Sequence, residues 1–471
     1  MEKKNTWETY SSKQLKELEK INAQYRDFLD NGKTERECID TIVNTIEKSG
    51  YRELESLIKE GAALKTGDKV YSVWMNKSIA MFQIGRKPMT DGMNILGAHI
   101  DSPRLDVKQN PLYEDGGFAY LDTHYYGGVK KYQWVTIPLA IHGVIVKKDG
   151  TCVEINIGEN EDDPVFFVSD LLIHLAQEQL EKKAAKVIEG EALDIIVGNK
   201  PLLIDKKDKK KDEKEAGKEA VKAGVLDILK ETYDIHEEDF VSAELEIVPA
   251  GKAREAGFDR SMTLAYGQDD RVCAYTSMQA MLDSDVTDRT MCCILVDKEE
   301  IGSVGATGMQ SHFFENAVAE VMNLAGEYSE LNVRRCLAHS CMLSSDVSSA
   351  FDPTYASSFD KKNVAYLGGG MVINKFTGAR GKSGSNDANA EYLAHLRHIF
   401  DKAEVNFQTA ELGKVDLGGG GTIAYILALY GMNVIDSGVA VLNMHAPWEA
   451  TSKADVYAVS YTHLTLPTIR L

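Results

Sequence analysis

Hydrophobic and polar positions follow two different periods along the chain. Between residues 11 and 62, apolar residues recur at helical spacing, which predicts two amphipathic helices, the second ended by Gly50. Residues 70–85 show the alternation of a strand hairpin, with Asn76 and Lys77 near its turn. Later apolar runs alternate with helical stretches, which predicts an α/β sheet whose functional site lies beyond the strand ends.

One apolar run, Cys292 to Val296, predicts a buried strand that is followed by two adjacent carboxylates, Glu299 and Glu300. Neighbouring residues at a strand end point in different directions, so the two side chains can do different jobs. One can bind a metal while the other stays free as a base for water. A solvated Glu-Glu turn is the alternative interpretation for an isolated pair, but other candidate ligands accompany this one.

Two histidines also end apolar runs. His99 closes a short strand-like segment, and Asp101 follows two residues later. A metal-ligating imidazole commonly gives its second ring N–H to a carboxylate, and this spacing suits that pairing. His445 closes a second run, residues 439–445. Taken alone, His99 would more often be a structural histidine.

Two further carboxylates stand at similar junctions. Asp269 precedes a helical run, where the pair Asp269-Asp270 could cap the helix or Asp269 could bridge two metals. Asp346 follows the semi-apolar run 333–343, which we interpret as a strand. Two histidines and three carboxylates fit two zinc ions about 3.5–4 Å apart with one carboxylate bridging.

Other residues with loosely metal-like or anion-like patterns carry less weight. Cys336, His339 and Cys341 alternate within the predicted strand and supply only three donors, so we discount a zinc site there. The glycine run in residues 416–422 precedes a predicted helix and exposes backbone N–H groups to an anion. It lacks the lysine of a P-loop, which argues against nucleotide binding.

Composition limits the class of protein. The 471 residues are 44% hydrophobic and can form two domains. A formal charge of −19 argues against nucleic-acid binding, and no apolar run is long enough for a membrane span. The N-terminus lacks a signal-peptide core, and seven cysteines without a CxxC pair suit a reducing cytoplasm.

Residues 109–251 differ in character and predict a separate, mainly β module. The predicted strand 135–146 contains His142, and a lone histidine in a strand is usually core or surface filler. The mixed-charge run 205–222 predicts a solvated loop or an exposed helix.

Taken together, these motifs resemble the M18 family of zinc aminopeptidases, of the aspartyl-aminopeptidase type. The resemblance extends from the N-terminal helices to about Tyr457. It is carried by the segments GAHIDSPRLDVK, THYYGGVKKYQWVTIPLAIH, FDRSMTLAYGQDDR, VDKEEIGS, SSDVSSA, GGGGTIAYILA and VLNMHAPWEATSKADVY. It implies a mixed-sheet catalytic domain of residues 1–108 and 252–471, interrupted by an inserted β domain of residues 109–251 that makes dimers.

The resemblance also implies a role for each candidate residue. His99 and His445 would bind one zinc each, Asp269 would bridge the two ions, and Glu300 and Asp346 would complete the two shells. Glu299 would be the general base, and Asp101 would orient His99. His142 would reach the active site of the neighbouring subunit, near the oxyanion. The substrate pocket would be lined by Lys375, Gly418, Gly419, Gly420 and Gly421.

The expected activity is removal of the N-terminal residue from peptides, with two zinc ions per subunit that cobalt or manganese can replace. Family members are often selective for N-terminal Asp or Glu, although some accept neutral residues. Since the chain is strongly acidic, such selectivity must come from local cations such as Lys375 and Lys382. The expected partners are peptide substrates and copies of the chain, with dimers assembling into a dodecamer.

Two other functions are weighed against this one. Another dinuclear zinc amidohydrolase, such as a deacylase or carboxypeptidase, shares motifs like those of His99 and Asp269. A non-catalytic assembly or cargo protein would need neither the base Glu299 nor all five ligands.

The end of the chain departs from the family pattern. After Tyr457 the family usually ends in a polar, aromatic helix, whereas Pro467 and the Thr/Leu alternation here do not suit a helix. Residues 458–471 look like a frame-shifted or library-derived, non-native end, and we assign His463 no function.

Overall fold

The computed structural model describes residues 5–202 and 219–468. The chain forms two compact units. Unit 1 contains Met1–Ser102, Ala253–Met444 and Trp448–Leu471, and unit 2 contains Pro103–Lys252 and His445–Pro447. Among the described residues, no helix is both long and apolar enough to cross a membrane.

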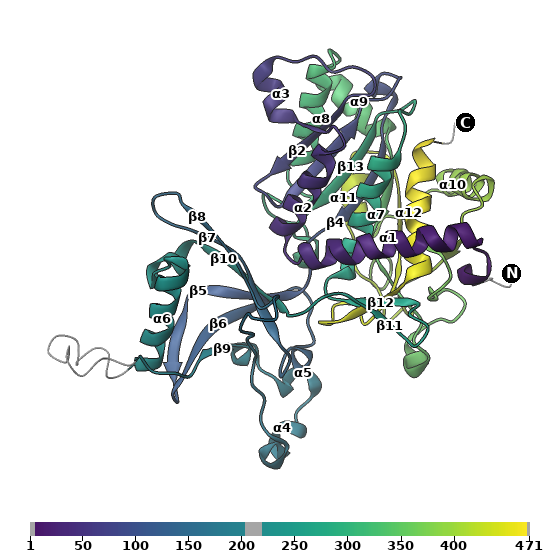
Figure 1. The fold of residues 1–471 in the computed structure, drawn as a ribbon. Coiled ribbons are helices and arrows are strands. Elements are labelled where there is room, and N and C mark those ends of the chain that lie inside the picture. The colour runs from purple at the N-terminus through teal and green to yellow at the C-terminus, as the bar shows by residue number, and fades with distance from the viewer. Residues whose placement is uncertain (1–4, 203–218, 469–471) are drawn as a thin grey trace. The chain divides into compact units, whose positions relative to one another are not determined.

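A nine-stranded mixed sheet forms the centre of unit 1 (Figure 1). Its strands, in spatial order, are β1 (Arg52–Glu53), β2 (Lys69–Trp74), β3 (Ser78–Gln83), β13 (Met291–Val296), β4 (Asn94–His99), β14 (Cys341–Ser345), β18 (Asn433–Gly438), β16 (Met371–Asn374) and β17 (Phe407–Thr409). The four central strands, from β13 to β18, run parallel. Because parallel strands end at the same edge of a sheet, the residues that follow β13, β4 and β14 are brought together.

Alternate residues of the central strands face two separate hydrophobic cores. In β13, Cys293 and Leu295 belong to one core, and Cys292 and Ile294 belong to the other. The first core is covered by α1 (Ser12–Asn31), α2 (Glu35–Glu47), α7 (Gln268–Asp283), α10 (Ala390–Lys402) and α12 (Lys453–Thr468). The second is covered by α3 (Leu54–Glu60), α8 (Phe313–Leu324), α9 (Glu330–His339) and α11 (Ala424–Ala428). This three-layer arrangement confirms the predicted α/β class.

Several local predictions agree with the described elements. β2 and β3 form the expected antiparallel hairpin, and Met75 and Asn76 take left-handed conformations at its turn. These conformations reverse the chain between Trp74 and Ser78, which pair with each other across the hairpin. Helices α1 and α2 begin at the capping boxes of Ser11 and Thr34.

A smaller five-stranded sheet completes unit 1. It consists of β11 (Arg254–Ala256), β12 (Met262–Ala265), β20 (Glu449–Ser452), β19 (Ala440–Leu442) and β15 (Ser348–Ser349). β12 and β19 both pair with β20 in antiparallel register. The sheet therefore ties the segment before α7 to the segment that follows His445.

Two sequence-based assignments in unit 1 are wrong. Residues 333–343 are not one strand, because they contain the end of α9 and the start of β14. Val333, Cys336 and Leu337 are buried at helical spacing. In a short apolar run, such a pattern cannot be told apart from that of a buried strand. The C-terminal segment also differs, because α12 continues through Pro467 to Thr468. Val459, Thr462 and His463 are fully buried, so tertiary packing outweighs the unfavourable local pattern.

Unit 2 is built on a six-stranded antiparallel sheet. Its strands are β8 (Cys152–Ile157), β7 (Leu139–Val146), β10 (Ala243–Pro249), β5 (Arg104–Asp115), β6 (Phe118–Tyr126) and β9 (Ile195–Gly198). Its helices are α4 (Gln177–Leu180), α5 (Ala184–Val187) and α6 (Ala220–Tyr233). Most of the charged run 205–222 lies outside the described residues, and only its last residues are seen, at the start of α6.

Candidate metal centre

The candidate ligands of unit 1 meet at the carboxyl ends of the central parallel strands. His99 is the last residue of β4 and lies opposite Val296 of β13. Asp346 directly follows β14. Glu299 and Glu300 form a short 3-10 helix, Glu299–Ile301, three residues beyond β13.

Asp269 reaches this edge from the first turn of α7. Its backbone angles, φ −84° and ψ 105°, are not helical, and its peptide bond to Asp270 is cis. Gly267 occupies the N-cap position of α7 and makes no side-chain capping hydrogen bond, and the helix-capping alternative for the paired aspartates stays a prediction.

His99 contacts the carboxylates of this edge through both ring nitrogens. Its Nε2 lies 3.2 Å from Oδ1 of Asp269 and 3.8 Å from Oδ1 of Asp346. Its Nδ1 lies 3.0 Å from the backbone oxygen of Asp101 and 3.3 Å from the Oδ1 of the same residue. Because the backbone carbonyl oxygen of Asp101 can only accept a hydrogen bond, Nδ1 carries the proton in the neutral ring, which leaves Nε2 to bind a metal.

Two groups of ligand atoms share one carboxylate. His99, Asp269 and Asp346 offer ligand atoms that all lie within 4.8 Å of one another. Asp269, Glu300 and His445 form a second such group. His445 belongs to the connection between β19 and β20, whose ends are held close because the two strands pair with each other. The structure thus brings together all five residues predicted to bind metal.

Glu299 differs from these five residues. Among the described residues it belongs to neither ligand group, although its Oε2 lies 3.9 Å from Nε2 of His99. Asp101 holds the segment in place, because its two carboxylate oxygens accept the backbone N–H groups of Glu299 and Glu300, at 3.1 Å each. One buried carboxylate therefore contacts the His99 ring and the backbone of both glutamates.

Two buried acidic groups of the cluster, Glu299 and Asp346, have raised pKa values. Burial raises the pKa of Glu299 to about 8; the positive charge of His99 lowers it, and the charges of Asp346, Asp101 and Asp269 raise it further. Burial also raises the pKa of Asp346, against the lowering effect of His99. For His99, burial lowers the pKa, but hydrogen bonds to Asp101, Asp269 and Asp346 raise it well above its usual value.

These shifts fit a metal centre, because buried carboxylates that repel one another are stabilised by a divalent cation. Imidazole nitrogen and carboxylate oxygen are also the donors that zinc takes in catalytic sites. The residues present therefore fit the predicted metal.

The predicted substrate residues lie on two neighbouring loops. Lys375 directly follows β16, and its Nζ pairs with Oδ1 of Asp387, while the Nζ of Lys382 lies 2.9 Å from Oδ2 of the same carboxylate. The backbone N–H of Gly378 donates to the carbonyl of Gly420 at 2.7 Å.

Close backbone packing accounts for the first two glycines of the run. A Cβ on Gly418 would lie 1.6 Å from the carbonyl oxygen of Leu412, and one on Gly419 would lie 2.0 Å from that of Gly378. Gly421, in contrast, has no neighbour within 4 Å of such an atom. The role of this loop in substrate binding remains a prediction.

His142 lies in β7 of unit 2 and is fully buried within the single chain. Its Nε2 lies 3.0 Å from Oε1 of Glu159. Its expected role in the site of a neighbouring subunit stays a prediction.

Sequence reasoning missed two residues next to Asp269. Glu449 is 1% exposed, and its Oε2 accepts the backbone N–H of Asp269 at 3.0 Å. The Ser102 hydroxyl donates to the backbone oxygen of Asp269 at 2.7 Å. Both residues stand close in sequence to a predicted ligand, but only the fold shows that they contact a different one.

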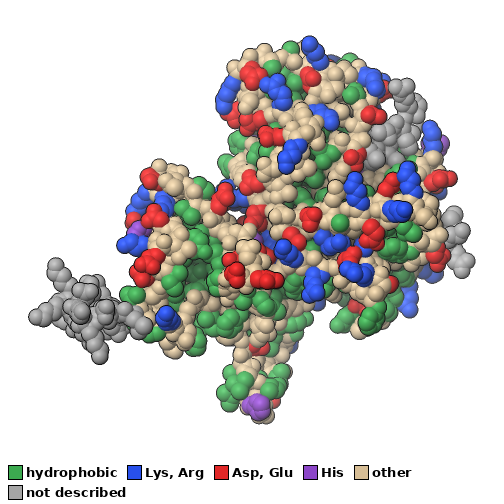
Figure 2. Space-filling model, in the orientation of Figure 1, with side chains coloured by type: hydrophobic (Ala, Val, Ile, Leu, Met, Phe, Trp, Pro, Cys, Tyr) green, Lys and Arg blue, Asp and Glu red, His purple; other side chains and the backbone are tan. Residues whose placement is uncertain are grey.

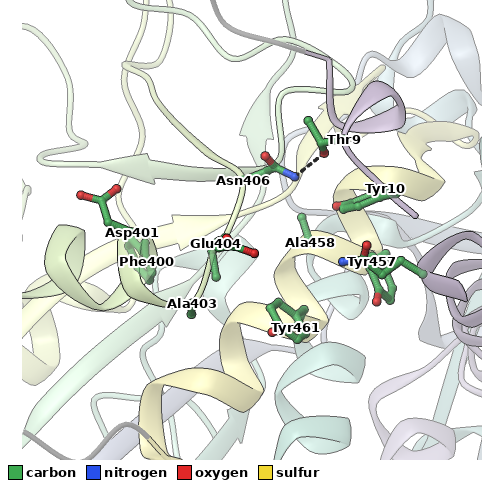
Figure 3. A pocket seen from close by; sticks show the side chains of 12 residues that line it. Thr9, Tyr10, Phe400, Asp401, Ala403, Glu404, Asn406, Tyr457, Ala458 and Tyr461 are labelled. Carbon is green, nitrogen blue, oxygen red and sulfur yellow. Dashed lines mark hydrogen bonds between the residues drawn. The ribbon is translucent and has the colours of Figure 1, made fainter. Parts of the chain in front are cut away.

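A separate cavity of about 440 Å³ lies elsewhere on unit 1 (Figure 3). It is lined by Tyr10, Glu404, Asn406, Tyr457 and Tyr461, among others, and by none of the metal-site residues. It has no part in the metal centre.

Comparisons with known proteins identify the family. A family model described as "Aminopeptidase I zinc metalloprotease (M18)" matches residues 28–464. The probable M18 family aminopeptidase 1 of Clostridium acetobutylicum is 63% identical over 456 residues, covering 97% of this chain and 96% of that protein.

Two crystal structures share the fold across the whole chain. Aminopeptidase I from Clostridium acetobutylicum is 59% identical, with a TM-score of 0.90 and full coverage of both chains. The M18 aminopeptidase of Thermotoga maritima is 43% identical, with a TM-score of 0.92 and 99% coverage of both. The chain therefore belongs to the M18 family of zinc metalloproteases, and it is a metalloaminopeptidase.

Proposed function

We propose that this metalloaminopeptidase works at a dinuclear centre and removes the N-terminal residue of peptides there. The observation that carries the proposal is the shared position of Asp269 in both groups of ligand atoms. A carboxylate common to two ligand groups is the usual bridge of a two-metal hydrolase.

In this proposal His99 and Asp346 would hold one ion, Glu300 and His445 would hold the other, and Asp269 would be shared by the two. Zinc is the metal named by the family, and cobalt or manganese are the expected replacements. When bound, zinc supplies Lewis acidity that polarises the scissile carbonyl and activates water. The N–H of His99 Nδ1, held by Asp101, orients the ring towards the metal.

Glu299 is the proposed general base. It takes a proton from the attacking water and later returns it to the leaving amine, so one residue acts first as base and then as acid. Its backbone N–H is fixed on Asp101, and its carboxylate lies at the edge of the ligand cluster. Burial and the neighbouring carboxylates raise the pKa of Glu299, and added positive charge would oppose that rise and favour the ionised, basic form at neutral pH.

We assign the substrate side of the centre to Lys375 and to the loop of Gly418–Gly421. Lys375 and Lys382 share one counter-ion, Asp387, so the positive charge available to an acidic N-terminal residue is reduced. Lys382 also lies 3.8 Å above the ring of Phe376. The preference for acidic over neutral N-terminal residues is therefore modest in this proposal.

The protein is proposed to act as a homo-oligomer, with dimers forming a dodecamer. The structure of mApe1 from S. cerevisiae, 20% identical with a TM-score of 0.74, is described as a dodecamer. In unit 2, hydrophobic side chains gather over the segment of α4 (Figure 2). Leu172, Ile173 and Leu175 are 54%, 67% and 67% exposed in the single chain, and apolar surface of this kind favours protein contacts. The seven free thiols fit the proposed cytoplasmic location.

The test of function combines metal content with a substrate panel. Zinc-loaded protein is given Asp-, Glu-, Leu- and Met-aminoacyl substrates, an N-acetylated peptide, and a peptide blocked at its carboxyl end. The expected result is about two zinc ions per chain, with cleavage only where the N-terminus is free. Cleavage of the acetylated peptide would instead support a deacylase or carboxypeptidase, and zinc-loaded protein inactive on every substrate would support an assembly role.

A further inference from the structure

The bridging carboxylate of Asp269 is attached to a backbone that the helix does not hold. Because the φ and ψ of Asp269 lie outside the helical range, α7 cannot by itself determine where its side chain points. The N–H and C=O of Asp269 are instead bound by two side chains from other parts of unit 1. These are the carboxylate of Glu449, at 3.0 Å from the N–H, and the hydroxyl of Ser102, at 2.7 Å from the C=O.

Glu449 is itself fixed within the smaller sheet. It is the first residue of β20, it is 1% exposed, and it pairs with Ala265 of β12. Its backbone oxygen accepts a hydrogen bond of 2.6 Å from the side-chain amide of Gln268, the residue before Asp269. Two hydrogen bonds thus connect the start of β20 to the two residues that open α7.

The amide of Gln268 is fully used in this network. Its NH₂ group donates to Glu449 and to the backbone oxygen of Thr263 at 3.1 Å. Its oxygen accepts from the hydroxyls of Thr451 at 2.7 Å and Tyr25 at 3.1 Å. A buried polar network whose members are satisfied is rigid, and it resists movement of any one member.

We propose that Glu449 is a positioning residue for the metal centre, which holds the bridging Asp269 in place through its backbone N–H. Glu449 follows His445 by four residues, so the strand that begins with Glu449 also anchors the connection carrying that ligand. The inference rests on the proposed two-metal function. Loss of a partner that orients a metal ligand typically lowers metal affinity or activity about 10–100-fold.

The experiment compares Glu449→Gln and Glu449→Ala with Glu255→Gln as a matched control. Glu255 is a largely buried carboxylate of β11 in the same sheet, and it pairs with Lys453 at 2.9 Å. Its ion-pair partners do not include any of the candidate metal ligands. Zinc affinity is measured by competition with a chelator, and the Tm of metal-free protein is measured alongside. Initial rates on Leu-aminoacyl substrate give kcat and KM.

We expect Glu449→Gln to weaken zinc binding by about 10-fold and Glu449→Ala by up to about 100-fold. In both variants kcat should decrease, and KM should change less than kcat. Glu255→Gln should lower the Tm while leaving zinc affinity unchanged. Wild-type zinc affinity in both Glu449 variants would overturn the proposal. Equal losses in Glu449→Gln and Glu255→Gln would also overturn it, since the effect would then be general destabilisation. Only one zinc ion per chain in the wild-type protein would refute the two-metal function itself. That measurement does not depend on any variant, so the two failures can be told apart.

Discussion

At the scale of single residues, Glu299 and Glu300 are neighbours with different surroundings. Glu300 belongs to a ligand group with Asp269 and His445, whereas Glu299 lies beside His99 without joining either group among the described residues. Their positions on one short 3-10 helix, both bound to Asp101, make the two residues a natural pair for comparison.

Glu299→Gln should therefore keep zinc and lose activity. The amide cannot take a proton from water, and general acid–base catalysis is worth about 10²–10⁴ in rate. Metal analysis and kcat on Leu-aminoacyl substrate check the prediction. Glu300→Gln is the matched comparison and should lose part of the zinc. Zinc loss in Glu299→Gln would make that residue a ligand instead of the base.

The raised pKa values of the cluster predict how the metal-free protein responds to pH. Glu299, Asp346 and His99 all have a higher pKa in the folded chain than their ordinary values, so the folded state binds more protons. The stability of the folded state then falls as pH rises. The contribution of Glu299 is lost between the ordinary pKa of a glutamate and about pH 8. The Tm of chelated protein should decrease from pH 5 to pH 8, and zinc should reduce that slope and release protons on binding. A Tm that rises over this range without metal would contradict the prediction.

Among the secondary-structure elements, the end of α12 forms a helix although its local pattern does not suit one. Its residue His463 is buried, with Nε2 at 3.0 Å from the hydroxyl of Ser345 and Nδ1 at 3.4 Å from that of Ser277. Burial lowers the pKa of His463 to about 4, so the ring is neutral at physiological pH. Ser345 directly precedes the candidate ligand Asp346, so α12 contacts the strand that carries this residue.

His463→Leu should destabilise the protein by about 1–3 kcal/mol, because the two serine hydroxyls lose a partner inside the core. Thermal unfolding of the zinc-loaded protein measures the loss. Tyr461→Phe, which removes a hydroxyl from a partly exposed side chain of the same helix, is the control and should have a smaller effect. Wild-type stability in His463→Leu would mean that this turn of α12 does not pack in solution.

At the scale of the whole molecule, the proposed oligomer determines whether a site is complete in one chain. His142 of the partner subunit is the proposed donor to the oxyanion, while Glu299 acts within its own chain. A symmetric dimer would then hold two composite sites.

Mixing two inactive variants, Glu299→Gln and His142→Ala, tests this arrangement after dissociation and reassembly. In a mixed dimer one site has Glu299 from one chain and the partner's His142, and the other site lacks both. Random mixing predicts recovery of about a quarter of the wild-type activity, since half of the dimers are mixed and each has one complete site. Activity at background, with mixed dimers confirmed by mass spectrometry, would contradict the shared site. If His142→Ala prevents assembly, His142→Gln replaces it in the mixing experiment.

Local pattern was enough to predict the elements whose residues agree with it, and it also indicated the candidate chemistry of the site. The run Cys292–Val296 forms a fully buried strand, and the loop between Trp74 and Ser78 contains Asn76 and Lys77, which were predicted to lie near the turn, because period and turn chemistry are local properties. The five candidate ligands could be named because His and carboxylate side chains at strand ends are chemically distinctive, and the family resemblance gave each an expected role.

The partners that hold those residues are seen only in the folded chain. Residues 333–343 and α12 were assigned wrongly because burial against other elements, not local pattern, sets their conformation. Glu449 could not be linked to Asp269, since the two residues are 180 positions apart and meet only where β20 pairs with β12. A hydrogen bond depends on the distance between two groups in space. A local sequence pattern describes only neighbours along the chain, so it cannot show contacts between segments that folding brings together.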